Sequence, residues 1–159
     1  MERSRRRQRV SFRHATLEDL RAVGGLVSDP DADVAFDQHR ALKRAVVFLV
    51  EHSPAAVFGI TRKWPTEASV GQVWSYIDRT QFRGNHANTR RLVELCKALI
   101  DWSHGEFGYT RIEASINADD ELALEFARVL GFHEESSRMK HAGPGGMDLV
   151  TVARLWESV

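Results

Sequence analysis

The sequence is poor in the residues that would hold a chain together by covalent or metal bonds. It has one cysteine, Cys96, so no disulfide can form within the chain, and a reducing compartment is expected. Its seven histidines include no i, i+4 pair and no His-x-His supported by carboxylates, so we expect no metal site. The fold must therefore depend on a packed apolar core.

Long apolar runs and net charge are also lacking. The longest apolar run, residues 45–50, is the length of a strand, so a membrane is not an expected partner. No apolar signal core follows the basic N-terminus, which favours a cytoplasmic protein. Lys plus Arg and Asp plus Glu both number 22, so the average charge gives no basic field for nucleic acid.

The overall composition is that of an ordinary globular protein, and the N-terminal segment is basic. The 159 residues are 43% apolar and 28% charged, enough for one domain with its own core. Residues 1–9 differ from the rest, and we interpret them as a flexible basic leader before a single domain at 10–159. Their positive charge comes from Arg3, Arg5, Arg6, Arg7 and Arg9.

The first half of the domain alternates between strand and helix patterns. Residues 10–14 read as a strand, and Thr16 with Asp19 is typical of a helix N-cap whose helix ends before Pro30. A second helix is expected at 33–43. The apolar runs 45–50 and 55–60 predict a hairpin with its turn at 51–54, and a third β run covers 70–77.

The second half begins with a long amphipathic pattern. Residues 88 to about 104 predict a helix that Gly105 and Gly108 end, followed by a strand at 111–116. Asp119 or Asp120 then caps a helix that Gly131 and Phe132 close as in a Schellman motif. Its apolar stripe is Leu122, Phe126, Val129 and Leu130. Two final strands, 132–140 and 147–156, flank the turn 143–146.

This order of elements resembles the GNAT acetyltransferase superfamily over nearly the whole chain. The likeness is carried by residues 12–20 (FRHATLEDL), 56–60 (AVFGI) and 124–132, which end in Gly-Phe. It implies an α/β (α+β) fold with a mixed, mostly antiparallel central sheet of six to seven strands and about four helices. The turn at 143–146 is similar to that of short GNAT-like proteins of tailed phages, which implies a phage-encoded protein in the host cell or virion.

The segment 78–89 lies where this superfamily binds the pyrophosphate of acetyl-CoA. Amide groups at a helix N-terminus attract phosphate, and glycine lets the backbone approach it closely. Arg83-Gly84 matches the start of such a loop, while His86 and Asn88 hold the two later small-residue positions. Read from the residues alone, the segment could equally be a plain strand-to-helix turn. The resemblance implies acetyl-CoA contacts at Ile77, Asp78, Arg83, Gly84, Asn85, His86, Ala87, Asn88, Thr89 and Asn117.

Four residues are candidates for proton transfer. Asp78 and Glu113 are carboxylates that could serve as general base, with Glu51 as a third, although each could be an ordinary strand-end carboxylate. The superfamily's tyrosine acid corresponds to Ala127, so Tyr76 is the substitute that we consider; its other interpretation is core packing.

The resemblance therefore predicts an N-acyltransferase that moves an acetyl group from acetyl-CoA to an amine by direct attack. The amine acceptor, a small molecule or a protein, is not specified by the sequence. The alternative is a catalytically inactive GNAT-fold module of phage type that binds a partner. A homodimer through the final strands is a further expectation, and nucleic acid binding through the leader is the least favoured.

Overall fold

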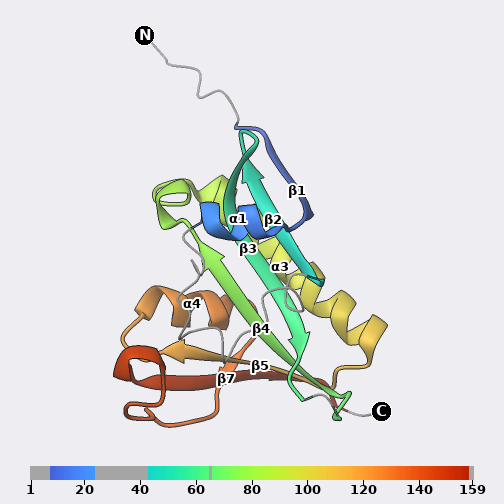
Figure 1. The fold of residues 1–159 in the computed structure, drawn as a ribbon, viewed down its shortest axis with the longest axis vertical. Coiled ribbons are helices and arrows are strands. Elements are labelled where there is room, and N and C mark those ends of the chain that lie inside the picture. Colours follow the sequence, from blue (N-terminus) through green and yellow to red (C-terminus); the bar gives the residue numbers. More distant parts are fainter. Residues whose placement is uncertain (1–7, 24–42, 65, 158–159) are drawn as a thin grey trace. The chain divides into compact units, whose positions relative to one another are not determined.

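The computed structural model describes residues 8–23, 43–64 and 66–157, and every structural statement below refers to them. The first half contains β1 (Val10–His14), α1 (Leu17–Ala22), β2 (Ala45–Val50), β3 (Ser53–Arg62) and β4 (Val70–Ile77). The second half contains α3 (His86–Phe107), β5 (Arg111–Asn117), α4 (Glu121–Val129), β6 (His133–Glu134) and β7 (Leu149–Leu155) (Figure 1). Two 3₁₀ turns lie at Arg79–Gln81 and Pro144–Gly146.

Parts of the predicted pattern lie outside the described residues. These are most of the leader, the end of the first predicted helix, and the predicted helix at 33–43 except its last residue, Lys43, which lies in a turn. No helix among the described residues is long and apolar enough to cross a membrane.

The described strands form one seven-stranded sheet with the hydrogen-bonded order β1-β2-β3-β4-β5-β7-β6. The pairs β1–β2, β2–β3, β5–β7 and β6–β7 are antiparallel, whereas β4 and β5 pair in parallel. The parallel pairing covers Val70–Gln72 against Arg111–Glu113. The predicted mixed, mostly antiparallel sheet of six to seven strands is confirmed.

The chain divides into two compact units. The first comprises Met1–Gly59 and Ser75–Thr89, and the second comprises Ile60–Trp74 and Arg90–Val159. Consequently β3, β4 and α3 each begin in one unit and end in the other. The expectation of a single domain at 10–159 stays a prediction.

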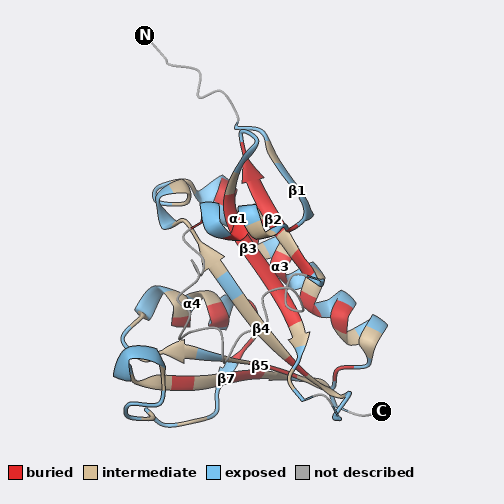
Figure 2. Cartoon of the chain, in the orientation of Figure 1, coloured by how far each residue is buried: buried red, intermediate tan, exposed pale blue. Residues whose placement is uncertain are grey.

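The core of the first unit is built on β2 and β3. All of β2 except Val46 is buried, as is the middle of β3 from Ala55 to Ile60, and these parts are red in Figure 2. Strands buried on both faces read as continuous apolar runs rather than alternating ones, which is the pattern of residues 45–50 and 55–60. The apolar runs therefore located this core correctly.

The turn that joins these strands is shorter than predicted. We expected a turn at 51–54, but Ser53 and Pro54 belong to β3 and only Glu51 and His52 form the turn. Both residues have positive φ, 48° and 71°, as a two-residue turn that follows the twist of the strands requires. The prediction was wrong because neither residue is the glycine or asparagine that usually marks such a turn.

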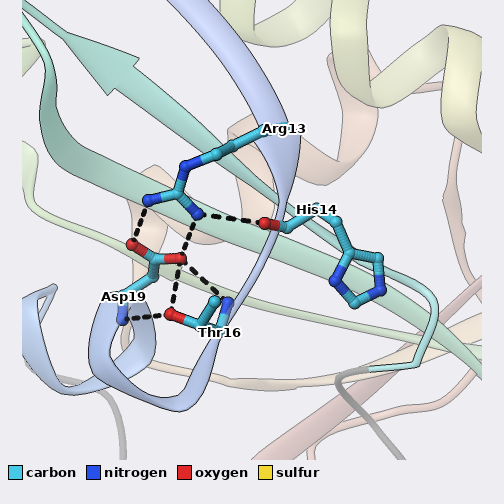
Figure 3. Close-up of polar contacts among 4 residues, drawn as sticks. All are labelled: Arg13, His14, Thr16 and Asp19. Carbon is cyan, nitrogen blue, oxygen red and sulfur yellow. Dashed lines mark hydrogen bonds and ion pairs between the residues drawn. The ribbon is translucent and has the colours of Figure 1, made fainter.

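Helix α1 is fixed to β1 by one buried carboxylate. Thr16 and Asp19 form the predicted cap as a reciprocal capping box. Figure 3 shows that Arg13 of β1 adds to it, because its Nη1 and Nη2 donate to the two oxygens of Asp19 at 2.6 and 2.9 Å. Burial raises the pKa of Asp19, but the hydrogen bonds from Arg13 and Thr16 outweigh it and lower the pKa overall.

Helix α4 of the second unit keeps the predicted ends but not the predicted buried face. Asp120 caps it, and the amides of Gly131 and Phe132 donate to Arg128 and Ala127 in a Schellman motif. The predicted stripe is wrong at Leu122 and Val129, which are 67% and 43% exposed. Leu130 is buried as predicted, and the other buried positions are Leu124 and Ala127.

The predicted final strands and helix ends also need correction. The strand expected at 132–140 is only His133–Glu134, with an isolated bridge from Met139 to Leu149. Helix α3 begins two residues before position 88 and continues through Gly105; it is Gly108, with φ of 69°, that follows its end. Cys96 is buried in this helix, and burial raises the pKa of its thiol.

Candidate functional site

The first unit contains the predicted segment 78–89, which follows the end of β4. The amide of Asp78 donates to Ala55 of β3, which extends the strand pairing to this residue. The Asp78 carboxylate then caps the 3₁₀ turn, because its Oδ1 accepts from Thr80 N at 3.1 Å and from Thr80 Oγ1 at 2.6 Å. The hydrogen bonds from Thr80 lower the pKa of Asp78. Asp78 is thus ionised at neutral pH.

The turn that follows depends on a glycine. Gly84 has φ of 69°, a conformation that residues with a side chain rarely adopt. A Cβ atom built at this position would meet nothing within 4 Å, so the space beside the backbone is open. The turn is held by the amides of Arg83 and Asn85, which donate to Arg79 and Phe82.

Asn85 is the cap of α3. Its Oδ1 accepts from the amide of Asn88 at 3.1 Å, and its carbonyl accepts from the amide of Thr89 at 3.1 Å. Among the described residues, the amides of His86 and Ala87 have no hydrogen-bond acceptor. Two donors at the positive end of a 22-residue helix therefore remain to bind an anion.

The side chains that replace the small residues do not fill this helix end. Asn88 is 2% exposed, and its Nδ2 donates to Oε1 of Gln8 at 2.9 Å, so its carboxamide is directed into the protein. Nδ2 of Asn85 donates to the same oxygen at 2.9 Å. The residues Arg83, Gly84 and His86 are exposed. The residues present thus fit a phosphate group at this turn.

Tyr76 and Ile77 come from the last part of β4 and are half-buried. Burial raises the pKa of Tyr76 above its ordinary value of 10, so its phenol carries a proton at neutral pH. Its protonation state therefore suits a proton donor.

The other predicted residues have structural partners. Glu113 belongs to the second unit and is 8% exposed; its carboxylate accepts from Lys63 and, at 2.8 Å, from Arg111. Burial raises the pKa of Glu113, but the two cations outweigh it and lower the pKa overall. Oδ1 of Asn117, also in the second unit, accepts from the amide of Asp119. Glu51 accepts from the amide of Arg9.

Ala127, at the place of the superfamily's tyrosine, is buried. Within the described part of the chain, no group of three or more His, Cys, Asp or Glu side chains could hold a metal ion.

The sequence alone did not indicate the contacts of Gln8 or the cations that pair with Glu113. Gln8 lies 77 and 80 positions from its two partners, and Lys63 lies 50 positions from Glu113. No spacing between nearby residues could have predicted these contacts.

Comparison with known proteins gives a structural likeness without a likeness in sequence. No protein-family model matches the chain, and no curated protein matches its sequence. A GNAT-family acetyltransferase from Bacillus anthracis has a TM-score of 0.65 and 14% identity, over 92% of this chain and 95% of its own.

Two further structures match to the same degree. The yncA protein of Salmonella typhimurium, a proposed acetyltransferase solved with its cofactor acetyl-CoA, has a TM-score of 0.66 and 14% identity over 94% of this chain and 95% of its own. A ribosomal-protein-alanine N-acetyltransferase from Brucella melitensis has a TM-score of 0.66 and 19% identity over 92% and 99%. Identities this low establish architecture alone: the chain has the fold of the GNAT acetyltransferases.

Proposed function

We propose that the chain is an acetyl-CoA-dependent N-acetyltransferase that acts on an amine. The observation that carries the proposal is the turn at Gly84, where a left-handed glycine with open space beside it precedes the free amides of His86 and Ala87. That arrangement is suited to the diphosphate of a nucleotide-like ligand. The likeness in fold to acetyltransferases, one of them solved with acetyl-CoA, supports the same function.

Residues of one continuous segment would hold the cosubstrate. The amides at the start of α3 would bind the diphosphate, and the exposed guanidinium of Arg83 would add positive charge beside it. Ile77 and Asp78, at the end of β4, would contact the pantetheine. The contact expected at Asn117 stays a prediction.

The chain's own groups can supply positioning and proton transfer. Acetyl-CoA, when bound, supplies an acyl thioester that an amine can attack. Holding the two reactants together accounts for much of the rate in such reactions, with effective molarities of roughly 10⁵ M or more. As the C–N bond forms and the C–S bond breaks, Asp78 would accept the amine proton through water and Tyr76 would donate to the thiolate sulfur.

A second candidate function is favoured by Ala127. The superfamily's acid is absent from this position, and a buried alanine cannot donate a proton. On that reading the chain binds a partner as a phage-type module and transfers no acetyl group. The homodimer, the phage origin and the cytoplasmic location also stay predictions.

Calorimetry followed by a turnover assay separates the two functions. We expect titration of acetyl-CoA to give saturable binding. Incubation with a diamine, an amino acid and a peptide with a free α-amino group should then release CoA thiol and add an acetyl mass to at least one amine. Saturable binding without acetylation of any amine would favour the partner-binding module. Absence of binding at millimolar acetyl-CoA would contradict the proposed enzyme.

A further inference from the structure

Gln8 is the one residue before β1 that contacts the start of α3 in the described part of the chain. Its Oε1 accepts two hydrogen bonds, from Nδ2 of Asn85 and Nδ2 of Asn88, each at 2.9 Å. One side-chain oxygen thus joins the two asparagines that lie on either side of the free amides at 86 and 87.

The position of Gln8 is set by the backbone next to it. The amide of Glu51 donates to the carbonyl of Arg9 at 2.8 Å, and Oε1 of Glu51 accepts from the amide of Arg9 at 2.7 Å. Glu51 is itself fixed in the left-handed turn between β2 and β3. This clamp extends the β1–β2 pairing by one residue and holds the neighbouring Gln8 in place.

The two hydrogen bonds decide how the asparagines are oriented. A carboxamide has an oxygen at one end and an NH₂ at the other, so directing Nδ2 of Asn85 toward Gln8 leaves Oδ1 facing the amide of Asn88. Without an acceptor at position 8, only the hydrogen bond from the amide of Asn88 favours this orientation over the reverse, which would place NH₂ against N–H. Gln8 also satisfies the carboxamide of buried Asn88, which would otherwise turn outward or lose its partner.

We propose that Gln8 is a positioning residue of the acyl-CoA turn: by orienting Asn85 and holding Asn88 inside, it leaves the amides of His86 and Ala87 free for the diphosphate. The inference rests on the proposed function, since it names a further residue for the same site. Gln8 touches no reacting atom in this role; it acts only through the two asparagines.

The test compares Gln8→Met, which keeps the length of the side chain but removes the acceptor, with Ser11→Ala, a change at an exposed residue of β1, the strand that follows Gln8. We expect Gln8→Met to raise the dissociation constant of CoA about fivefold, the equivalent of one lost helix cap. The KM for acetyl-CoA should rise by a similar factor with kcat unchanged, and hydrogen exchange should quicken at the amides of Asn88 and Thr89, which Asn85 caps. Ser11→Ala should leave all three quantities at the wild-type level.

A double-mutant cycle separates positioning from general loss of stability. Serine at position 85 caps a helix with a single oxygen that needs no orienting partner. In the Asn85→Ser background, Gln8→Met should therefore weaken CoA binding by clearly less than fivefold. An equal loss in both backgrounds, or no loss in the wild-type background, would overturn the inference.

The two proposals can fail separately. If the wild-type chain does not bind CoA, the proposed function fails. Titration of the amides of residues 86–89 with inorganic pyrophosphate in the wild type and Gln8→Met then still decides the role of Gln8. Equal affinity of the two proteins for pyrophosphate, together with equal hydrogen exchange at the amides of Asn88 and Thr89, would contradict it.

Discussion

The carboxylate of Glu113 carries its charge in a mostly buried position, where Lys63 and Arg111 neutralise it. We expect Glu113→Gln to lower the free energy of unfolding at pH 7 by about 2–3 kcal/mol, because it leaves two partly buried cations without their shared partner. Chemical denaturation measures this loss. Glu125→Gln is the matched control, since Glu125 pairs with Arg128 on the exposed face of α4 and should change stability little.

The free energy of unfolding that Glu113→Gln loses should become smaller as the pH falls. The pKa of Glu113 is lower in the folded protein than its ordinary value of 4.5. Its stabilising effect is therefore fully present above pH 4.5 and disappears as the pH falls through the folded-state pKa. The difference between wild type and Glu113→Gln should narrow below pH 4.5; a constant difference down to pH 3 would mean that the ion pairs do not stabilise the fold.

Asp78 has a structural and a proposed chemical role, and one substitution separates them. Asparagine keeps an oxygen that can accept from Thr80, so Asp78→Asn should retain the 3₁₀ turn and the melting temperature. A carboxylate whose pKa is lowered is a weak base, so we expect kcat to fall only about tenfold, below the usual range for a general base. An unchanged kcat in steady-state assays would leave Asp78 as a cap alone.

At the scale of elements, the turn before α3 can be tested with a matched pair of glycines. Gly84 and Gly145 have φ of 69° and 66°, and a Cβ atom at either would meet nothing within 4 Å. Alanine at each should therefore cost a similar free energy of unfolding, about 1 kcal/mol, for the left-handed backbone. Calorimetry should show weaker acetyl-CoA binding for Gly84→Ala only. Equal affinities in the two variants would place the cosubstrate elsewhere.

Helix α4 presents two overlapping apolar stripes, and only one is buried. Leu124→Ala should lower the free energy of unfolding by about 2–3 kcal/mol, because it removes a side chain that is 8% exposed. Leu122→Ala should change it by less than about 0.5 kcal/mol, because that side chain is 67% exposed. Urea denaturation of the two variants gives both values. Similar losses in the two variants would show that Leu122 is buried, as the sequence predicted.

How much the sequence predicts depends on whether the signal is local. The bounds of β4, the capping box at Thr16 and the Schellman motif at Gly131 were predictable, because each is encoded within a few neighbouring residues. In α4 the larger side chains of Leu122 and Val129 led the apolar pattern to predict the wrong buried face. Tertiary packing buries the smaller Ala127 instead. The role of Gln8 depends on residues nearly eighty positions away, which no periodicity reports.

At the scale of the whole molecule, the two units share three continuous elements. β3, β4 and α3 cross from one unit to the other, so neither unit can unfold completely without disrupting a strand or helix of its neighbour. We therefore expect a single cooperative unfolding transition, which is usual for chains of this length.

The distribution of aromatic residues makes this expectation measurable. All four tryptophans, Trp64, Trp74, Trp102 and Trp156, belong to the second unit, so their fluorescence reports that unit, whereas far-ultraviolet circular dichroism reports both. The two melting curves should coincide. Acetyl-CoA proposed to bind at 83–89, in the first unit, should stabilise the fold by about 2.7 kcal/mol at a hundredfold excess over Kd. Because the units unfold together, the tryptophans of the second unit should report that same upward shift. A shift seen by dichroism but not by fluorescence would show that the units unfold independently.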